Sequence, residues 1–511
     1  MQTFLGIDVG TSGIKTVLID HAGRVLLTDI EEHSFTTPEP LHAESDPEDW
    51  WTGTVTSLKR VCEFARLHSH EIAAVGLTGQ MHGLVILDKH RAVLRPCIMW
   101  NDQRTASQCM QITKTIGSDE LLKITGNQVL PGFTAPKILW VAEHEPDIYA
   151  KINHVLLPKD YIRLKLTGEL VTDVSDASGT SLLDVADRAW SSTITTKLGI
   201  DRSWLPQLME SQEVSGYVSA EAADRTGLPQ GIPVVSGAGD QAAGGIGAGI
   251  TASGRASIVL GTSGVVFAQS SAYETHETGL IHSFCHALPE TWHVMGVTLS
   301  AAGSFKWYKD LFSRSGQAGA AQSDPYDQLI REAVTTPPGA EGLFFLPYLS
   351  GERTPHPDPL ARGSFFGLTL RHERGHMTRA LLEGVSFSLR DALSLIHKMG
   401  IEPTEFRISG GGARSPFWRQ LIADVIQAEV ITTTSTEGAP YGAAMLAVVA
   451  AGEYNSAAEA ADAMIMVQDR HTPDSKLSEY YDEAFSLYQS LYNEFKQSYT
   501  RISKLEGNDE T

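Results

Sequence analysis

Two copies of the tetrapeptide Gly-Thr-Ser-Gly, at residues 10–13 and 261–264, are well suited to binding an anion. Glycine lets backbone N–H groups approach an anion closely, and the threonine and serine hydroxyls add further donors. Each copy lies between short apolar runs, which predicts a β-hairpin with the tetrapeptide as its turn. The same residue types are common in ordinary turns, so either copy alone is weak support. Together they predict two turns that hold one triphosphate.

Only the first copy has charged residues beside it, Asp8 before the turn and Lys15 after it. Asp8 can hold Mg²⁺ through water and orient a phosphoryl group, because magnesium bound to phosphates usually keeps few protein ligands. The alternative is an aspartate that only stabilises the turn. This asymmetry predicts that the first turn handles metal and the transferred phosphate, while the second holds the tail of a nucleotide.

Asp240 is the only acidic residue between Val235 and Thr251, and it lies among glycines after an apolar run. A general base must first lie within hydrogen-bonding distance of a bound hydroxyl, and only then does its pKa matter. A carboxylate in this glycine-rich turn could lie that close. One alternative is a dinucleotide-binding fingerprint over residues 237–242, which is less favourable because an acid inside the loop would repel a pyrophosphate. The other is a simple helix N-cap.

Two further polar groups follow predicted strands. Met81 and His82 lie on a glycine-flanked turn, an unusual place for a purely structural pair, although an isolated histidine is more often structural. The glycine triplet at residues 410–412 precedes a predicted helix and suits close passage of a nucleotide, with Arg414 and Ser415 beside it. These parts together predict phosphoryl transfer, in which positioning and charge neutralisation supply most of the catalysis.

The elements that must position these residues alternate between strand and helix patterns. A helix is predicted to begin at Asp46 and Pro47, and another at Pro416. The small residues of 242–249 predict a closely packed helix, and the spacing of apolar residues over 477–495 predicts a C-terminal helix that docks on the protein, with a frayed tail after about residue 503. The pattern is that of an α/β protein.

Composition limits the classes of partner. The chain has 511 residues, with 40 Lys and Arg against 61 Asp and Glu, a formal net charge of −21. This balance argues against nucleic acid or an anionic membrane as the main partner. Four widely spaced cysteines predict reduced thiols, and neither a secretory leader nor a membrane-spanning apolar run is evident. We therefore expect a cytoplasmic protein with no membrane segment.

Two long motifs resemble the signatures of the FGGY carbohydrate kinases, and the resemblance extends from about residue 4 to residue 451. The first is Gly-Phe-Thr-Ala-Pro-Lys-Ile-Leu-Trp at 132–140, followed by Glu143 and His144. The second is Gly-Ser-Phe-Phe-Gly-Leu at 363–368, followed by His-Met at 376–377 and Ala-Leu-Leu-Glu at 380–383. Further likeness, which we interpret mainly as architecture, lies at residues 100–104, 157–161 and 350–355.

The resemblance implies two ribonuclease-H-like domains of the actin and hexokinase type, with an interdomain cleft that holds sugar deep inside and ATP at its mouth. The implied N-terminal domain is 1–250, with the sugar and the catalytic base. Residues 251–490 would form the C-terminal domain for the nucleotide, and 491–511 the end of the last helix and a frayed tail.

The resemblance also implies roles for individual residues. It makes Asp240 the catalytic base, beside which we expect Asp8 to act as the second catalytic carboxylate because of its position before the first turn. Sugar contacts would come from Met81 and His82, where members that phosphorylate glycerol carry an Arg-Glu pair, and from Asp240 and Gln241. Gln241 departs from the Asn that xylulose-phosphorylating members often carry. The implied ATP contacts are Thr11, Ser12, Gly13 and Lys15 in the first turn, Thr262 in the second, and Gly411, Gly412 and Ser415 in the glycine loop.

The expected activity is therefore transfer of the γ-phosphoryl group of ATP, with Mg²⁺, to the C5 hydroxyl of D-xylulose, as in bacterial members of the family that use this sugar. Alternatives are a kinase for another ketopentose or a polyol, such as L-xylulose, ribulose or glycerol, and a non-catalytic sensor of ATP and sugar. The sequence leaves the oligomeric state open, with a homodimer among the alternatives.

Overall fold

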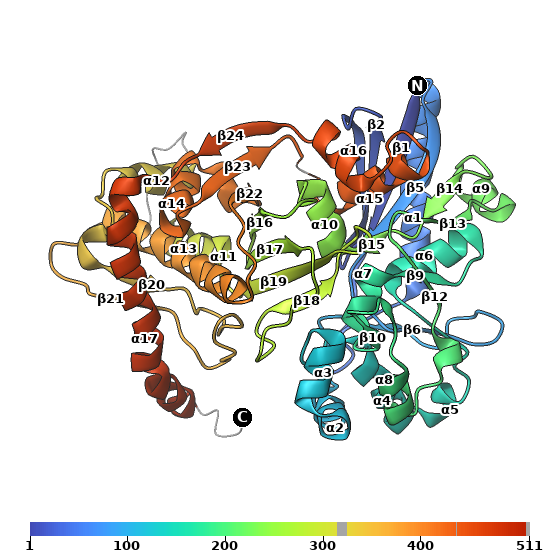
Figure 1. Ribbon diagram of the computed structural model, residues 1–511, viewed down its shortest axis with the longest axis horizontal. Coiled ribbons are helices and arrows are strands. Elements are labelled where there is room, and N and C mark those ends of the chain that lie inside the picture. Colours follow the sequence, from blue (N-terminus) through green and yellow to red (C-terminus); the bar gives the residue numbers. More distant parts are fainter. Residues whose placement is uncertain (314–323, 436, 507–511) are drawn as a thin grey trace. The chain divides into compact units, whose positions relative to one another are not determined.

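The computed structural model describes residues 1–313, 324–435 and 437–506 (Figure 1). By its internal contacts the chain divides into two units. Unit 1 comprises Met1–Ser253, Gln269–His293 and Ser435–Met466, and unit 2 comprises Gly254–Ala268, Val294–Thr434 and Val467–Thr511. Unit 1 therefore includes a segment from late in the sequence. Residues 507–511 of the expected tail lie outside the described residues.

Unit 1 contains most of the short strands, together with helices from both ends of the sequence. Its α-helices (α), 3₁₀ helices (η) and strands (β) are β1 (Gln2–Val9), β2 (Gly13–Asp20), β3 (Val25–Glu32), β4 (Glu44–Ser45), α1 (Pro47–Leu67), β5 (Glu71–Gly79), β6 (Val85–Leu87), β7 (Cys97–Ile98), α2 (Ala106–Ile116), α3 (Ser118–Thr125), α4 (Thr134–His144), α5 (Pro146–Tyr149), β8 (His154–Leu156), α6 (Pro158–Thr167), β9 (Val171–Asp173), α7 (Val174–Ala177), η1 (Ser178–Thr180), β10 (Leu183–Asp184), β11 (Ala189–Trp190), α8 (Ser192–Leu198), η2 (Arg202–Trp204), β12 (Gln207–Met209), β13 (Val214–Tyr217), α9 (Ala220–Thr226), β14 (Pro233–Val235), β15 (Ala238–Gly239), α10 (Asp240–Ala248), β18 (His282–Cys285), α15 (Ala439–Ala450) and α16 (Ala457–Met464).

The main sheet of unit 1 has the strand order β13-β14-β5-β1-β2-β3, and β15 pairs with the end of β5. β1 is antiparallel to β2 and parallel to β5, while β15 is also parallel to β5. The carboxyl ends of β1, β5 and β15 therefore meet at one edge of the sheet. Ligands of open α/β sheets commonly bind at such an edge.

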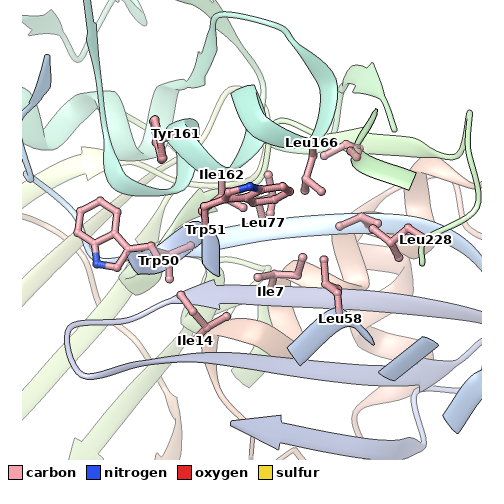
Figure 2. Packing of buried hydrophobic residues seen from close by; sticks show 14 of the residues in the cluster. Ile7, Ile14, Trp50, Trp51, Leu58, Leu77, Tyr161, Ile162, Leu166 and Leu228 are labelled. Carbon is pink, nitrogen blue, oxygen red and sulfur yellow. The ribbon is translucent and has the colours of Figure 1, made fainter. Parts of the chain in front are cut away.

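Side chains alternate between the two faces of this sheet, as strand geometry requires. On one face, Ile7 and Leu77 pack with Trp50, Trp51 and Leu58 of α1, which Figure 2 shows from close by together with residues of α6. On the other face, alternate residues such as Phe4, Val17 and Ala74 pack with α10 and α15. The sheet is thus covered on both sides, which explains its continuous apolar strands.

Glycines allow α15 to lie unusually close to the sheet. A Cβ atom at Gly6 would lie 1.9 Å from the carbonyl oxygen of Pro440, and one at Gly76 would lie 1.8 Å from that of Ala443. Gly442 of α15 approaches α10 in the same way, with 1.9 Å between its added Cβ and the carbonyl oxygen of Ala243. The predicted small-residue helix over 242–249 is confirmed as α10, and these contacts explain its composition.

Unit 2 is built around a second sheet, in which β16 pairs antiparallel with β17 and parallel with β22. Its strand order includes β19-β17-β16-β22-β23-β24. The elements centred in this unit are β16 (Arg255–Leu260), β17 (Gly264–Ser270), β19 (Trp292–Thr298), α11 (Ala302–Ser313), α12 (Pro325–Val334), η3 (Ala340–Gly342), β20 (Phe344–Leu346), β21 (Ser364–Phe366), α13 (Arg374–Lys398), β22 (Glu405–Ser409), η4 (Gly412–Arg414), α14 (Pro416–Ile426), β23 (Glu429–Thr433), β24 (Val467–His471), η5 (Ser475–Leu477) and α17 (Ser478–Leu505).

Several local predictions are confirmed. Both Gly-Thr-Ser-Gly copies are hairpin turns, between β1 and β2 and between β16 and β17. Helix α1 begins with Asp46 as N-cap, whose Oδ1 accepts a hydrogen bond from the Glu48 N–H at 3.0 Å, and with Pro47 in its first turn. The C-terminal helix is α17, which buries Tyr481, Tyr488 and Leu491 among other residues. Over the described residues, no helix is long and apolar enough to cross a membrane.

Candidate active site

The first hairpin turn presents donors at the edge of the unit 1 sheet. The Gly10 N–H donates to the Gly13 carbonyl at 3.0 Å, which closes the turn. Within the described residues, the backbone N–H groups of Thr11 and Ser12 have no protein acceptor. The Trp100 indole Nε1 donates to Thr11 Oγ1 at 2.9 Å. Two N–H groups and an oriented hydroxyl can therefore receive phosphate oxygens.

Asp8 and Lys15 face each other across this hairpin. They are directly paired in the antiparallel register of β1 and β2, so their side chains lie on the same face of the sheet. Lys15 Nζ also forms an ion pair with Glu437 Oε2 at 2.9 Å, just before α15. Sequence reasoning missed Glu437, because its approach depends on the return of the chain to unit 1.

Asp240 is the first residue of α10 and follows β15 directly, so the competing interpretation of a helix N-cap is wrong: Gly239 is the N-cap. Because Ala238 and Asp8 both align with Thr78 of β5, the residues Asp8 and Asp240 lie on either side of the same strand end. The first turn of a helix favours a negative charge, since the backbone N–H groups there are unsatisfied. The fold thus brings the two predicted catalytic carboxylates to one edge.

Both carboxylates have raised pKa values. Burial, and then the charge of Asp240, raise the pKa of Asp8 to about 7, while Lys15 opposes the shift. Burial raises the pKa of Asp240 to about 6, against hydrogen bonds from the backbone and side chain of Gln241. By accessible surface the two residues are only half-buried, so solvent still reaches part of each residue. Paired, perturbed carboxylates of this kind are typical of catalytic sites.

The carboxylate of Asp8 fits a divalent cation. Its Oδ1 atom is buried and, within the described residues, lacks a hydrogen-bond partner. A cation or its bound water would satisfy this oxygen and offset the repulsion between Asp8 and Asp240. Among those same residues, no group of three or more acidic, histidine or cysteine side chains could enclose a metal by itself. That donor set suits magnesium held mainly by water and phosphate.

Met81 and His82 follow β5 at the same edge as Asp240. A Cβ atom at Gly239 would lie 3.0 Å from Met81 Cγ, so Met81 packs directly on the residue before Asp240. His82 has a φ of 71°, in the left-handed region that histidine seldom adopts, and this strain must be held by its surroundings. Its Nδ1 donates to the Gly179 carbonyl at 2.7 Å.

The first family signature holds His82 in this conformation. Phe133 stacks on the imidazole, with 4.6 Å between ring centroids. Thr134 Oγ1 and Lys137 Nζ donate to the carbonyl oxygen of His82 at 3.0 and 2.9 Å. The sequence identifies the motif at 132–140 only as a family signature, because its contacts with His82 join residues about 50 positions apart.

In unit 2, the second hairpin turn and the glycine loop lie side by side. Strands β16 and β22 are parallel neighbours, with Val259 opposite Ser409, so both lead into these loops at one edge. Gly410 has a φ of 92°, and a Cβ there would lie 2.5 Å from the Leu260 carbonyl oxygen. In the second turn, the Thr262 carbonyl accepts N–H groups from Ala301 and Gly303, at 2.9 and 3.2 Å.

The residues of unit 2 that are predicted to contact the nucleotide differ in whether a ligand can reach them. Gly411 is exposed, and an added Cβ there would meet nothing within 4 Å. Thr262 is also exposed, whereas Gly412 is buried against Trp418 and Leu260. Ser415 is the N-cap of α14 and accepts the Trp418 N–H at 3.3 Å, which is a structural use of its hydroxyl. The predicted residues thus fall into two groups, one in each unit.

Comparisons with known proteins support a common origin for the whole chain. The model of the FGGY family of carbohydrate kinases, N-terminal domain, matches residues 3–247, and that of the C-terminal domain matches residues 256–451. The curated xylulose kinase of Escherichia coli (strain K12) is 42% identical over 98% of this chain and 99% of its own length. The xylulose kinase of Bacillus subtilis (strain 168) is 38% identical over 99% of this chain and 100% of its own length. A solved structure described as a "xyloylose kinase" from Brucella ovis is 40% identical, with a TM-score of 0.89 over 97% of this chain and 99% of that chain.

Proposed function

Because this chain belongs to the FGGY family of carbohydrate kinases, we propose that it transfers the γ-phosphoryl group of ATP to D-xylulose and forms D-xylulose 5-phosphate. The choice of sugar follows the E. coli and B. subtilis relatives named xylulose kinase, which align with this chain over nearly their full lengths. The observation that carries the chemistry is the pair of half-buried carboxylates, Asp8 and Asp240, beside a turn whose Thr11 and Ser12 N–H groups have no acceptor within the described residues.

In this proposal Asp240 is the general base. Its carboxylate accepts the proton of the C5 hydroxyl as that oxygen forms a bond to the γ-phosphorus of ATP, while the bond from the γ-phosphorus to the β,γ-bridging oxygen breaks and ADP leaves. Burial raises the pKa of Asp240 to about 6, which leaves the residue ionised at neutral pH and makes it a better proton acceptor than an ordinary aspartate.

Lys15 and the first hairpin turn, with Thr11, Ser12 and Gly13, stabilise the negative charge of the transferred phosphoryl group. Asp8 would hold Mg²⁺, which neutralises phosphate charge when bound. The ion pair of Lys15 with Glu437 keeps the ammonium group near the turn before ATP arrives. The nucleotide is assigned to unit 2, with Thr262, Gly411, Gly412 and Ser415 as contacts.

The sugar contacts are Met81, His82 and Gln241. Clamping of His82 by Phe133, Thr134 and Lys137 supports a binding role, because a strained histidine is held by three residues beside the proposed base. The side chain of Gln241 also lowers the pKa of Asp240, against the effect of burial. We further propose that residues 1–250 form the domain that binds the sugar and supplies the base, and that residues 251–490 form the domain that binds the nucleotide. The enzyme is proposed to be cytoplasmic, in keeping with its four free cysteines. Assembly as a homodimer stays a prediction.

The test is a panel of sugars read by ADP release at sub-saturating concentration, so that kcat/KM ranks them. The panel contains D-xylulose, L-xylulose, ribulose and glycerol, with a sugar-free reaction as the control. We expect D-xylulose to give the highest kcat/KM and a product phosphorylated at C5 by ³¹P NMR. A higher kcat/KM for another sugar would reassign the substrate, and ATP binding without ADP release from any of them would indicate a sensor.

A further inference from the structure

One short segment, residues 173–180, contacts both the strand that leads into Asp240 and the imidazole of His82. It contains the last residue of β9, helix α7 and the 3₁₀ helix η1. The segment is buried throughout.

At its first end, Ser175 holds the residue before the proposed base. The Gly239 N–H donates to Ser175 Oγ at 3.2 Å, and Ser175 Oγ donates to Asp173 Oδ2 at 2.5 Å. The same carboxylate oxygen accepts Ser211 Oγ at 3.0 Å, and the Ser211 carbonyl accepts the Gly237 N–H at 2.9 Å. Two backbone N–H groups in the stretch before Asp240, those of Gly237 and Gly239, are therefore each linked to Asp173 through one serine.

A buried ionic cluster fixes Asp173 in turn. Lys159 Nζ contacts Asp160, Asp173 and Asp176 at 2.7, 2.8 and 3.0 Å, and all four side chains are fully buried. Burial raises the pKa of Asp176, whereas Lys159 and Arg163 hold the pKa of Asp160 low against the effect of burial. Lys159 and Arg163 both form ion pairs with Asp160, and such pairing is what allows charges to be buried.

Arg163 extends this cluster to the backbone of the same stretch. Its Nη1 donates to Asp160 Oδ1 at 2.6 Å, and its Nη2 donates to the carbonyl oxygen of Ser236. Gly237 has a φ of 70°, and a Cβ there would lie 1.9 Å from the Leu77 carbonyl oxygen. Residues 236–239 are thus tied to the cluster on one side and to β5 on the other.

At its second end, the segment contacts the proposed sugar-binding pair. The Gly179 carbonyl accepts His82 Nδ1–H at 2.7 Å. A Cβ at Gly179 would lie 2.4 Å from His82 Nδ1 and 3.0 Å from Met81 Cε. Any side chain at position 179 would therefore displace the imidazole.

We propose that residues 173–180 act as a positioning element, in which Ser175 sets the location of Asp240 and Gly179 sets that of His82. This inference rests on the proposed roles of those two residues. Because one rigid segment spans both contacts, the distance between the base and the sugar-binding imidazole is fixed before substrate arrives. A displacement near 1 Å in such a geometry can cost about 10²-fold in rate.

The first test replaces Ser175 by alanine. Ser175→Ala leaves the Gly239 N–H without its acceptor, so we expect kcat to fall by about 10- to 100-fold while KM for the sugar changes less than about twofold. The matched control is Ser191→Ala at the start of α8, because Ser191 Oγ is also buried and accepts a backbone N–H, from Ile194, at 3.2 Å. We expect this control to keep kcat within about twofold of the wild-type value.

The second test replaces Gly179 by alanine. We expect Gly179→Ala to raise KM for the sugar by about tenfold or more, with KM for ATP unchanged, as His82→Ala would do. The double variant Gly179→Ala/His82→Ala should be no worse than His82→Ala alone, because the imidazole is the nearest group to the added Cβ, at 2.4 Å against 3.0 Å for Met81 Cε at the flexible end of its side chain. Thermal unfolding midpoints of all variants establish that they fold.

Equal losses of kcat in Ser175→Ala and Ser191→Ala, or additive losses in the double variant, would overturn the positioning role. All ratios are taken with the sugar that the wild-type enzyme turns over fastest. If the wild-type enzyme turns over a sugar other than D-xylulose fastest, the proposed substrate changes but this test of the positioning element does not. Loss of all turnover in the wild type would contradict the proposed function itself.

Discussion

Asp8 and Asp240 repel each other across the end of β5: after burial, the charge of Asp240 is the largest influence that raises the pKa of Asp8, to about 7. Strand pairing enforces this proximity, since β1 and β15 both lie beside β5 in parallel register. A cation between substrate phosphates and Asp8 would relieve the repulsion, so cation binding should stabilise this edge of the sheet.

Replacing Asp240 by asparagine should remove the base without changing the shape of the site. We expect turnover to fall by about 10²- to 10⁴-fold, with the dissociation constant for sugar little changed. ADP release and sugar titration by calorimetry measure the two quantities. Asp224→Asn, at an exposed position on α9, is the control. Near-normal turnover of folded Asp240→Asn would reject the assigned role.

Replacing Asp8 by asparagine should stabilise the ligand-free protein at high pH. The pKa of Asp8 is raised to about 7 from 3.8, so the folded state binds more protons than the unfolded state between these values, and stability falls as pH rises through them. The asparagine of the Asp8→Asn variant does not titrate and carries no such cost. We expect a higher midpoint of thermal unfolding than in the wild type, with a larger difference at pH 8 than at pH 5. A difference independent of pH would show that Asp8 is not perturbed.

His82→Ala should weaken the binding of ketopentose more than that of ATP. The imidazole is held by Phe133 and by the Gly179 carbonyl beside Met81, so its loss opens the sugar contact alone. We expect KM for the sugar to rise by about tenfold or more, and KM for ATP to stay within about twofold. If both constants rise equally, His82 has a structural role only.

Trp100→Phe removes the indole N–H that orients the hydroxyl of Thr11. One hydrogen bond contributes about 0.5–1.5 kcal/mol, so KM for ATP should rise by roughly two- to tenfold. Trp190→Phe is a matched control, because Trp190 Nε1 also donates at 2.9 Å, to the Pro206 carbonyl on the same unit. An equal KM for ATP in the two variants would show that Trp100 has no role in the phosphate-binding turn.

Gly76→Ala should destabilise the protein, because its Cβ would lie 1.8 Å from the Ala443 carbonyl oxygen and force α15 away from the sheet. We expect a loss of about 3 kcal/mol, at the upper end of overpacking effects. Gly244→Ala in α10 meets nothing within 4 Å and should gain up to about 1 kcal/mol from helix propensity. Denaturant unfolding compares the two, and similar midpoints would contradict the close contact.

Local chemistry made much of this molecule predictable. The two hairpins, the start of α1 at Asp46 and Pro47, and the helix after Asp240 follow from turn residues and caps that act within a few positions. The ion pair of Lys15 with Glu437 and the clamp of Lys137 on His82 could not be predicted, because they join residues 422 and 55 positions apart. Nothing in the local pattern near Ser175 distinguishes it from an ordinary buried serine.

The dependence of unit 1 on α15 affects how the chain matures on the ribosome. Strand β5 ends at Gly79 and the first segment of unit 1 ends at Ser253, yet the helix that covers one face of β1 and β5 begins only at Ala439. At typical elongation speeds of about 5–20 residues per second, synthesis from Ser253 to α15 takes roughly 10–40 s, and the apolar face of the sheet stays uncovered during that time. A nascent chain stalled in this interval would expose the uncovered apolar face of the sheet, to which chaperones can bind. Any truncation before α15 should therefore yield an insoluble product.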